Sequence, residues 1–144
     1  MSTFTLDSSC MVAAVCTWHE RHAAVAAEVE RRLSRGGRLV TAAHALMETY
    51  AVLTRLPAPH RVSSPDAWML ILTNFVTPAK VVALPATGHV ALLRALAGNA
   101  VGGGRTYDAL IAATFERSLP MDLLTLNPRH FEARDGFIVV EPGQ

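Results

Sequence analysis

The sequence contains little charge, few cysteines and a single lysine. Charged residues make up 17% of the 144 residues and hydrophobic residues 51%, a balance that excludes an intrinsically disordered chain. Thirteen basic residues against twelve acidic ones leave a net charge of +1, so nucleic acid would have to be held by a local patch of cations. Two cysteines allow at most one disulfide, which excludes the densely cross-linked framework of small secreted proteins.

Long apolar runs and two common catalytic motifs are also missing. Near the N-terminus the longest apolar run covers residues 11–15, too short for a signal peptide or a membrane span, so we expect a cytoplasmic protein. The glycine-rich residues 98–104 lack the Lys-Ser/Thr pair of a phosphate-binding P-loop. There is no G-x-S-x-G sequence, which excludes the nucleophile elbow of serine hydrolases.

What the sequence does contain is an alternation of short apolar strands with longer helical segments. Strands are predicted at residues 4–7, 38–41, 81–84, 123–126 and 137–140. Helices are predicted at residues 22–35, 43–56, 65–76, 86–97 and 107–119. This pattern predicts a small parallel sheet with helices on both faces, a three-layer α/β/α sandwich formed by residues 1–144 as one domain.

Three polar residues fall where an α/β sheet places its ligands. Asp7 ends the first predicted strand, and Asn127 follows the fourth. Ligands of open α/β sheets bind beyond the carboxyl ends of the strands, so both side chains are candidates for a site. Asp108 falls in the first turn of a predicted helix, where the helix dipole favours a carboxylate and where simple helix capping is the alternative.

Glu48 is the only charged residue between His44 and Arg55, in a helix that is apolar almost all round. A carboxylate in such a place is costly unless a metal, a cation or strong hydrogen-bond donors meet it. A buried pair with one arginine is the alternative to a metal. Together with Asp7 and Asp108, Glu48 would complete a set of three carboxylates that repel one another without a divalent cation. Oxygen ligands of this kind suit Mg²⁺ or Mn²⁺ and predict metal-assisted phosphoryl chemistry.

Four segments, in order along nearly the whole chain, carry a resemblance to a known family. They are Leu6-Asp7-Ser8-Ser9, Ala45-Leu46-Met47-Glu48-Thr49, Tyr107-Asp108-Ala109-Leu110-Ile111-Ala112-Ala113 and Leu124-Thr125-Leu126-Asn127-Pro128-Arg129-His130-Phe131. These segments resemble the successive motifs of PIN-domain nucleases. Within that family, the chain length and the last two segments most resemble the VapC-type toxins of bacterial toxin–antitoxin pairs.

The resemblance implies an acidic pocket that holds Mg²⁺ or Mn²⁺ and cleaves RNA. Asp7, Glu48 and Asp108 match the three core acids of the family, both as catalytic residues and as metal ligands. Asn127 stands where a fourth acid is often found, and its neutral amide would orient a water instead of neutralising a second metal. Thr125, expected on the same strand face, would support that water.

The resemblance also implies partners. A VapC-type protein is expected to cut an RNA substrate, to form a homodimer and to bind a small antitoxin protein whose segment lies across the active-site groove. The apolar helix around Glu48 and the apolar residues 68–76 would offer surface for such association. Arg105 and Arg129 flank the expected site and are candidates for contacts with substrate phosphates.

A second hypothesis is a non-catalytic α/β module that binds nucleic acid or protein, with or without structural zinc. Cys10, Cys16, His19 and His22 have the residue types of a zinc site in the arrangement C-x5-C-x2-H-x2-H. That spacing is not the spacing of a standard zinc finger. Two core thiols and two surface or capping histidines are the simpler interpretation.

Overall fold

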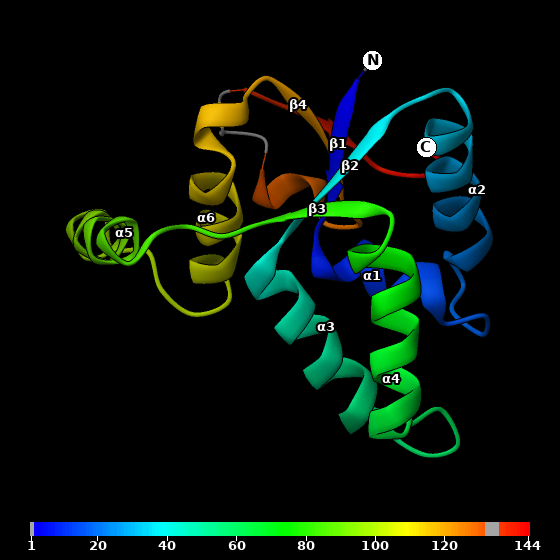
Figure 1. The fold of residues 1–144 in the computed structure, drawn as a ribbon. Helices are drawn as coiled ribbons and strands as arrows, with labels where there is room; N and C mark the ends of the chain where they lie inside the picture. The colour runs from blue at the N-terminus through cyan, green and yellow to red at the C-terminus, as the bar shows by residue number, and fades with distance from the viewer. Residues whose placement is uncertain (1, 132–135) are drawn as a thin grey trace.

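The computed structural model describes residues 2–131 and 136–144, and its centre is a sheet of five parallel strands (Figure 1). These are β1 (Thr3–Leu6), β2 (Arg38–Ala42), β3 (Ala79–Val82), β4 (Met121–Leu124) and β5 (Phe137–Val140). They lie in the order β3-β2-β1-β4-β5, and each strand pairs in parallel with its neighbours. The first strand of the chain is therefore central, between β2 and β4.

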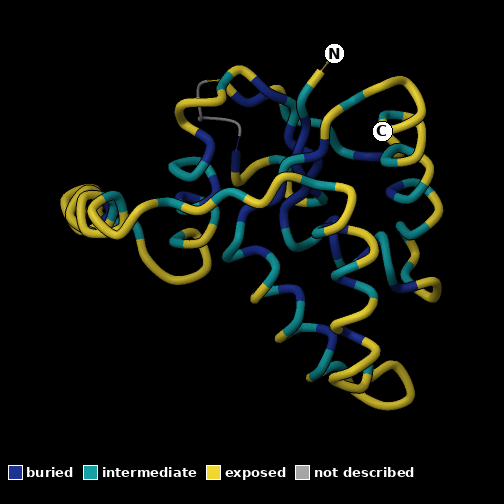
Figure 2. The backbone as a smooth tube through the Cα atoms, in the orientation of Figure 1, coloured by how far each residue is buried: buried dark blue, intermediate teal, exposed yellow. Residues whose placement is uncertain are grey.

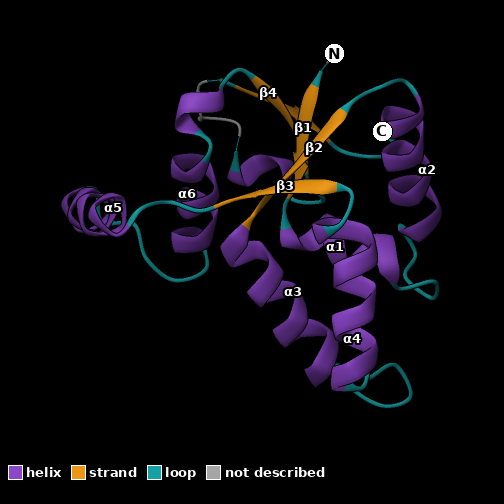
Figure 3. Cartoon of the chain, viewed as in Figure 1, coloured by secondary structure: helices purple, strands orange, loops and turns teal. Residues whose placement is uncertain are grey.

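Helices cover both faces of the sheet, with α2 on one side and α6 on the other (Figure 3). The longer helices are α1 (Ser8–Val15), α2 (His22–Ser34), α3 (Ala43–Arg55), α4 (Ser64–Ile71), α5 (Ala86–Gly98) and α6 (Arg105–Thr114). The shorter helical segments are η1 (Leu72–Val76), η2 (Glu116–Ser118) and η3 (Pro128–His130). The predicted α/β/α sandwich around a parallel sheet is confirmed.

Arg32 holds α2 against its face of the sheet. Phe4 of β1 and Asp122 of β4 are paired across the two strands and so project from the same face. The Arg32 guanidinium lies 5.5 Å from the centre of the Phe4 ring and donates to Asp122 at 2.6 Å. It also donates to Glu28 of its own helix at 2.7 Å. A single cation therefore links a helix to two neighbouring strands.

β3, β4 and α6 each start two residues earlier than the sequence predicts. β3 begins at Ala79 instead of residue 81, and β4 begins at Met121 instead of residue 123. β4 ends at Leu124, and the backbone N–H of Leu126 donates to the Ser9 hydroxyl at 3.0 Å instead of joining a strand. α6 begins at Arg105 instead of residue 107, with Gly104 as its N-cap residue.

α5 stands clear of the sheet and packs beside α6 (Figure 1). Of its side chains only Leu96 is buried, and Figure 2 shows most of the helix as exposed. None of the described helices combines the length and the apolar character that a membrane span needs.

At Gly37, directly before β2, the chain passes close to the end of α2 and to the sheet. A Cβ atom at Gly37 would lie 2.8 Å from the carbonyl oxygen of Arg32 and 3.4 Å from the Phe4 ring. Gly37→Ala should therefore lower the free energy of unfolding by about 1–3 kcal/mol, because the backbone must move. Gly102→Ala, where nothing lies within 4 Å, should stay within about 1 kcal/mol of the parent in the same urea titration. Equal stability of the two variants would contradict this close approach.

Candidate active site

Four segments of the chain meet at the carboxyl edge of the sheet. Asp7 directly follows β1, and Thr125 and Asn127 follow β4. Glu48 lies in α3, which starts directly after β2, and Asp108 lies in the first turn of α6. Because the strands are parallel, their carboxyl ends share one edge, and this edge is where α/β sheets place their sites.

Asp7 is buried and held from three directions. As the N-cap residue of α1 it accepts the Cys10 backbone N–H at 3.1 Å through Oδ1, which also accepts the Ser9 hydroxyl at 2.5 Å. Its Oδ2 accepts the Thr125 hydroxyl at 2.5 Å. Burial raises the pKa of Asp7, and these three donors offset part of that rise. The carboxylate is therefore costly to ionise but fixed in orientation.

The same hydroxyls tie down the segment after β4. Ser9 Oγ accepts the Leu126 backbone N–H at 3.0 Å, and Thr125 Oγ1 accepts the Asn127 backbone N–H at 2.9 Å. Thr125 lies one residue beyond β4, not on a strand face shared with Asn127. Its hydroxyl donates to the Asp7 carboxylate and accepts from the Asn127 backbone N–H.

Glu48 is half-buried and faces Ser8 and His44. The Ser8 hydroxyl donates to Oε2 at 3.3 Å, and His44 Nε2 lies 3.8 Å from Oε1. Burial lowers the pKa of His44 to about 4, so at neutral pH this contact is a neutral imidazole against a carboxylate and not an ion pair. Burial also raises the pKa of Glu48. Among the described residues, Glu48 is contacted by Ser8 and His44, and no arginine pairs with it there.

Asp108 is held by a residue from another segment. His130, the last residue of η3, places Nδ1 2.9 Å from Asp108 Oδ2. The Asp108 side chain is largely covered, whereas that of His130 is more open. The helix that carries Asp108 begins at Gly104 without a side-chain cap, so its first turn has no anchor of that kind.

The three carboxylates are close enough to affect one another's ionisation. In addition to burial, the charge on Asp108 raises the pKa of Asp7, and the charges on Asp108 and Asp7 both raise that of Glu48. Within residues 2–131 and 136–144, no three His, Cys, Asp or Glu side chains are gathered as a ready-made metal site. Carboxylates repel one another, and this repulsion adds to burial in opposing their ionisation.

The alternative zinc set of Cys10, Cys16, His19 and His22 is likewise not assembled among the described residues. Both thiols are buried in the core, and burial raises the pKa of each. The His22 ring contacts a backbone carbonyl of α1 at 2.9 Å, and His19 Nδ1 accepts a backbone N–H at 3.0 Å. The simpler interpretation of these residues agrees with the structure.

The remaining candidates lie on α6, which carries Asp108, and on the segment that follows β4. Arg105 is the first residue of α6, and Arg129 is the middle residue of η3; both are exposed. Asn127 is exposed as the residue before η3. All three side chains are thus open to solvent.

Sequence reasoning missed the side chains that hold the acids. Ser8 and Ser9 are named only as part of the first motif, although a Ser-Ser pair directly after Asp7 is well placed to hydrogen-bond at the start of a helix. His130 had no separate signal, because its contact with Asp108 joins elements far apart in the sequence.

Asp7 should make the protein less stable as the pH rises. Its folded-state pKa lies above the ordinary value of 3.8, so the folded protein holds this proton more tightly than the unfolded chain does. The stabilisation is complete below pH 3.8 and is lost as the pH rises through the folded-state pKa. Asp7→Asn should therefore melt above the parent at pH 7 in EDTA, with a difference that shrinks toward pH 4.

The control for this measurement is Glu30→Gln, a neutralised carboxylate at an exposed position of α2. Its melting temperature, followed by circular dichroism, should differ from the parent by a small amount that does not depend on pH. An Asp7→Asn variant that melts below the parent at pH 7 would show that the anion, with its three donors, stabilises the fold.

Comparison with known proteins agrees with this architecture. The family model of the PIN domain matches residues 4–135. Ribonuclease VapC40 of Mycobacterium tuberculosis is 43% identical over 126 residues, which cover 88% of this chain and 87% of that protein.

Two solved structures share the fold at low sequence identity. One is VapC20 of Mycobacterium tuberculosis, described as a sarcin-ricin loop cleaving toxin, with a TM-score of 0.63, 17% identity and coverage of 83% of this chain and 86% of that chain. The other is DNA-bound VapBC of Salmonella typhimurium, with a TM-score of 0.64, 19% identity and coverage of 97% and 98%. Taken with the family model and the 43% identical relative, these matches show that the chain belongs to the PIN-domain family and, within it, to the VapC group.

Proposed function

We propose that this chain is a Mg²⁺- or Mn²⁺-dependent endoribonuclease that acts as the toxin of a toxin–antitoxin pair. The observation that carries the proposal is the meeting of the Asp7, Glu48 and Asp108 carboxylates, from three separate elements, at one edge of the sheet. Support comes from the relative at 43% identity, which is named a ribonuclease. Such a toxin would act in the cytoplasm, where it would meet its RNA substrate.

The donor set suits a hard divalent cation. Asp7, Glu48 and Asp108 would hold it, since carboxylate oxygens are the ligands that Mg²⁺ and Mn²⁺ prefer. Once bound, the cation would activate a water and stabilise negative charge at the phosphodiester. The mutual repulsion that raises the pKa of Glu48 and Asp7 is the unfavourable interaction that cation binding relieves.

The chain's own residues would position the reacting groups. Ser9 and Thr125 keep the Asp7 carboxylate in one orientation. Thr125 donates its proton to Asp7, so toward a water its hydroxyl would act as an acceptor. Asn127 would orient a water or a phosphate oxygen through its amide, and because it carries no charge it would not hold a second cation tightly. Arg105 and Arg129 would contact phosphates of the RNA beside the cleaved bond.

We further propose that a small antitoxin protein binds across the acidic edge and blocks it. Support comes from the solved VapBC assembly that shares this fold. A segment laid over Asp7, Glu48 and Asp108 would exclude RNA from the same edge. Cations on that segment would also relieve the repulsion among the three acids.

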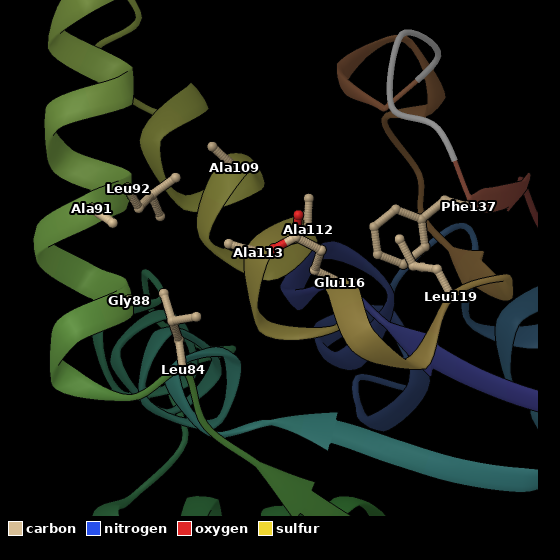
Figure 4. A pocket seen from close by; sticks show the side chains of 10 residues that line it. All are labelled: Leu84, Gly88, Ala91, Leu92, Ala109, Ala112, Ala113, Glu116, Leu119 and Phe137. Carbon is tan, nitrogen blue, oxygen red and sulfur yellow. The ribbon is translucent and has the colours of Figure 1, made fainter.

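A homodimer completes the proposed assembly. Val90 and Leu93 on α5 are 63% and 67% exposed, an unusual degree for apolar side chains of a 13-residue helix. A hollow of about 520 Å³, lined mainly by apolar side chains, lies between α5 and α6 next to Leu92 and Ala109 (Figure 4). We propose that α5 forms part of the dimer surface. The apolar surface expected on α3 and α4 would form the rest, and on α3 the Met47 side chain is 70% exposed.

Cleavage of RNA should depend on the divalent cation and on the acids. The parent should cut total RNA in Mg²⁺ or Mn²⁺ and not in EDTA. Asp7→Asn and Asp108→Asn should lose more than about 100-fold in rate, because even the partners of metal ligands matter at the 10- to 100-fold level. The measurement is gel analysis with mapping of the cut ends.

The matched control is Asp66→Asn, an exposed carboxylate at the start of α4, which should cut like the parent. Expression of the parent should arrest growth of the host, and expression of Asp7→Asn should not. RNA that is bound but left intact by the parent would favour the non-catalytic binding module instead.

Association should be visible by light scattering at micromolar concentration. The parent should have twice the mass of the 15.5 kDa chain. Leu93→Gln should shift the mass toward the monomer, because it removes apolar surface from α5 while keeping helix propensity. Ile138→Thr, which replaces an equally open apolar side chain on β5, should leave the dimer intact. A monomeric parent, or a dimer that Leu93→Gln does not disturb, would refute this surface.

A further inference from the structure

The contact between His130 and Asp108 differs from the other contacts that hold the acids. Asp7 and Glu48 are met by hydroxyls, those of Ser9 and Ser8 in the first turn of α1 and that of Thr125 after β4. Asp108 is met by a ring nitrogen from η3, with His130 Nδ1 2.9 Å from Oδ2. The histidine therefore links the start of α6 to the segment that follows β4.

We propose that His130 is a positioning residue that fixes the Asp108 carboxylate for cation binding. The proposal rests on the proposed function of the acidic edge. It assigns to His130 an effect on the affinity for the cation, and no direct contact with the RNA.

The histidine is the anchored member of this pair. The backbone N–H of His130 donates to the Asn127 carbonyl at 3.1 Å, and Pro128 fixes the start of the same turn. The next residue, Phe131, is buried and meets the Phe137 ring edge-on, with ring centres 6.4 Å apart. η3 is therefore fastened to the core of the protein.

Asp108, in contrast, lies on an element with a weakly fixed start. Gly102, Gly103 and Gly104 precede α6, and Gly104 caps the helix without a side-chain hydrogen bond. Glycine gives this approach wide conformational freedom. A donor on the anchored η3 therefore restricts the orientation of Asp108 more than α6 alone would.

The chemistry of the pair allows His130 and a cation to share Asp108. A carboxylate has two oxygens and about four lone-pair directions, so a hydrogen bond to Oδ2 leaves acceptor capacity for a metal. Hydrogen-bond partners of ligating carboxylates orient them, and loss of such a partner typically costs 10- to 100-fold in metal affinity or activity. His130 is in the position of such a partner.

Two substitutions separate this role from a structural one. His130→Leu removes the donor, whereas His130→Asn places an amide N–H close to where Nδ1 was. His60→Leu is the control, because His60 lies in the turn between α3 and α4, where it stacks on Trp18. Each variant is first checked for an unchanged thermal melt in EDTA.

The measured quantity is the Kd for Mn²⁺ by calorimetry without RNA, followed by kcat and KM for a model RNA over a range of Mn²⁺ concentrations. His130→Leu should weaken Mn²⁺ binding about 10- to 100-fold, and saturating Mn²⁺ should recover most of its kcat. His130→Asn and His60→Leu should stay within about threefold of the parent in Kd.

Failure of this proposal and failure of the proposed function look different. If the parent binds Mn²⁺ and cuts RNA but His130→Leu has the parent's Kd, the positioning role is wrong while the function stands. A kcat that stays low at saturating Mn²⁺ would show that His130 acts on the reaction itself, which also overturns the proposal. If the parent neither binds Mn²⁺ nor cuts RNA, both fall.

Discussion

The buried carboxylate of Asp7 is the group on which the rest of the site depends. It caps α1, and through the Ser9 and Thr125 hydroxyls it ties that helix to the segment after β4. An ionised carboxylate in this place is costly, and three donors offset only part of the cost. The fold therefore maintains an unfavourable charge at the edge of the sheet where a cation would bind. Stability and function compete at this residue.

The sequence predicted the framework because the framework follows from local patterns. Short apolar strands that alternate with helices predict a parallel sheet covered on both faces. In such a sheet, acidic residues that follow the strands lie at the same edge. Burial raises the pKa of Glu48, as expected for a carboxylate in an apolar helix, and among the described residues its hydrogen-bond donor is Ser8. Strand ends were less predictable. β4 stops where the Ser9 hydroxyl, from a distant helix, takes the Leu126 N–H.

The contacts that hold the acids could not be predicted in this way. Ser9 with Leu126, Thr125 with Asp7, and His130 with Asp108 each join parts of the chain that are brought together only by the completed sheet. A single serine, threonine or histidine is enough to make each of these hydrogen bonds. Such residues therefore do not recur at a regular spacing that the sequence would reveal. Cys10, Cys16, His19 and His22 illustrate the opposite case. They have the residue types of a zinc site and lie close in sequence, but both thiols are buried in the core and the described residues form no metal site.

The strand order also determines when the site can exist during synthesis. β1 is made first but lies in the middle of the sheet, and its neighbour β4 is made after residue 120. A chain still growing on the ribosome has Asp7 and Glu48, yet it lacks Asp108 and the Thr125 donor until most of its length has been translated. Long-range parallel pairing of this kind is also slow to form. The acidic edge is therefore complete only after nearly the whole chain has been made and the sheet has closed around β1.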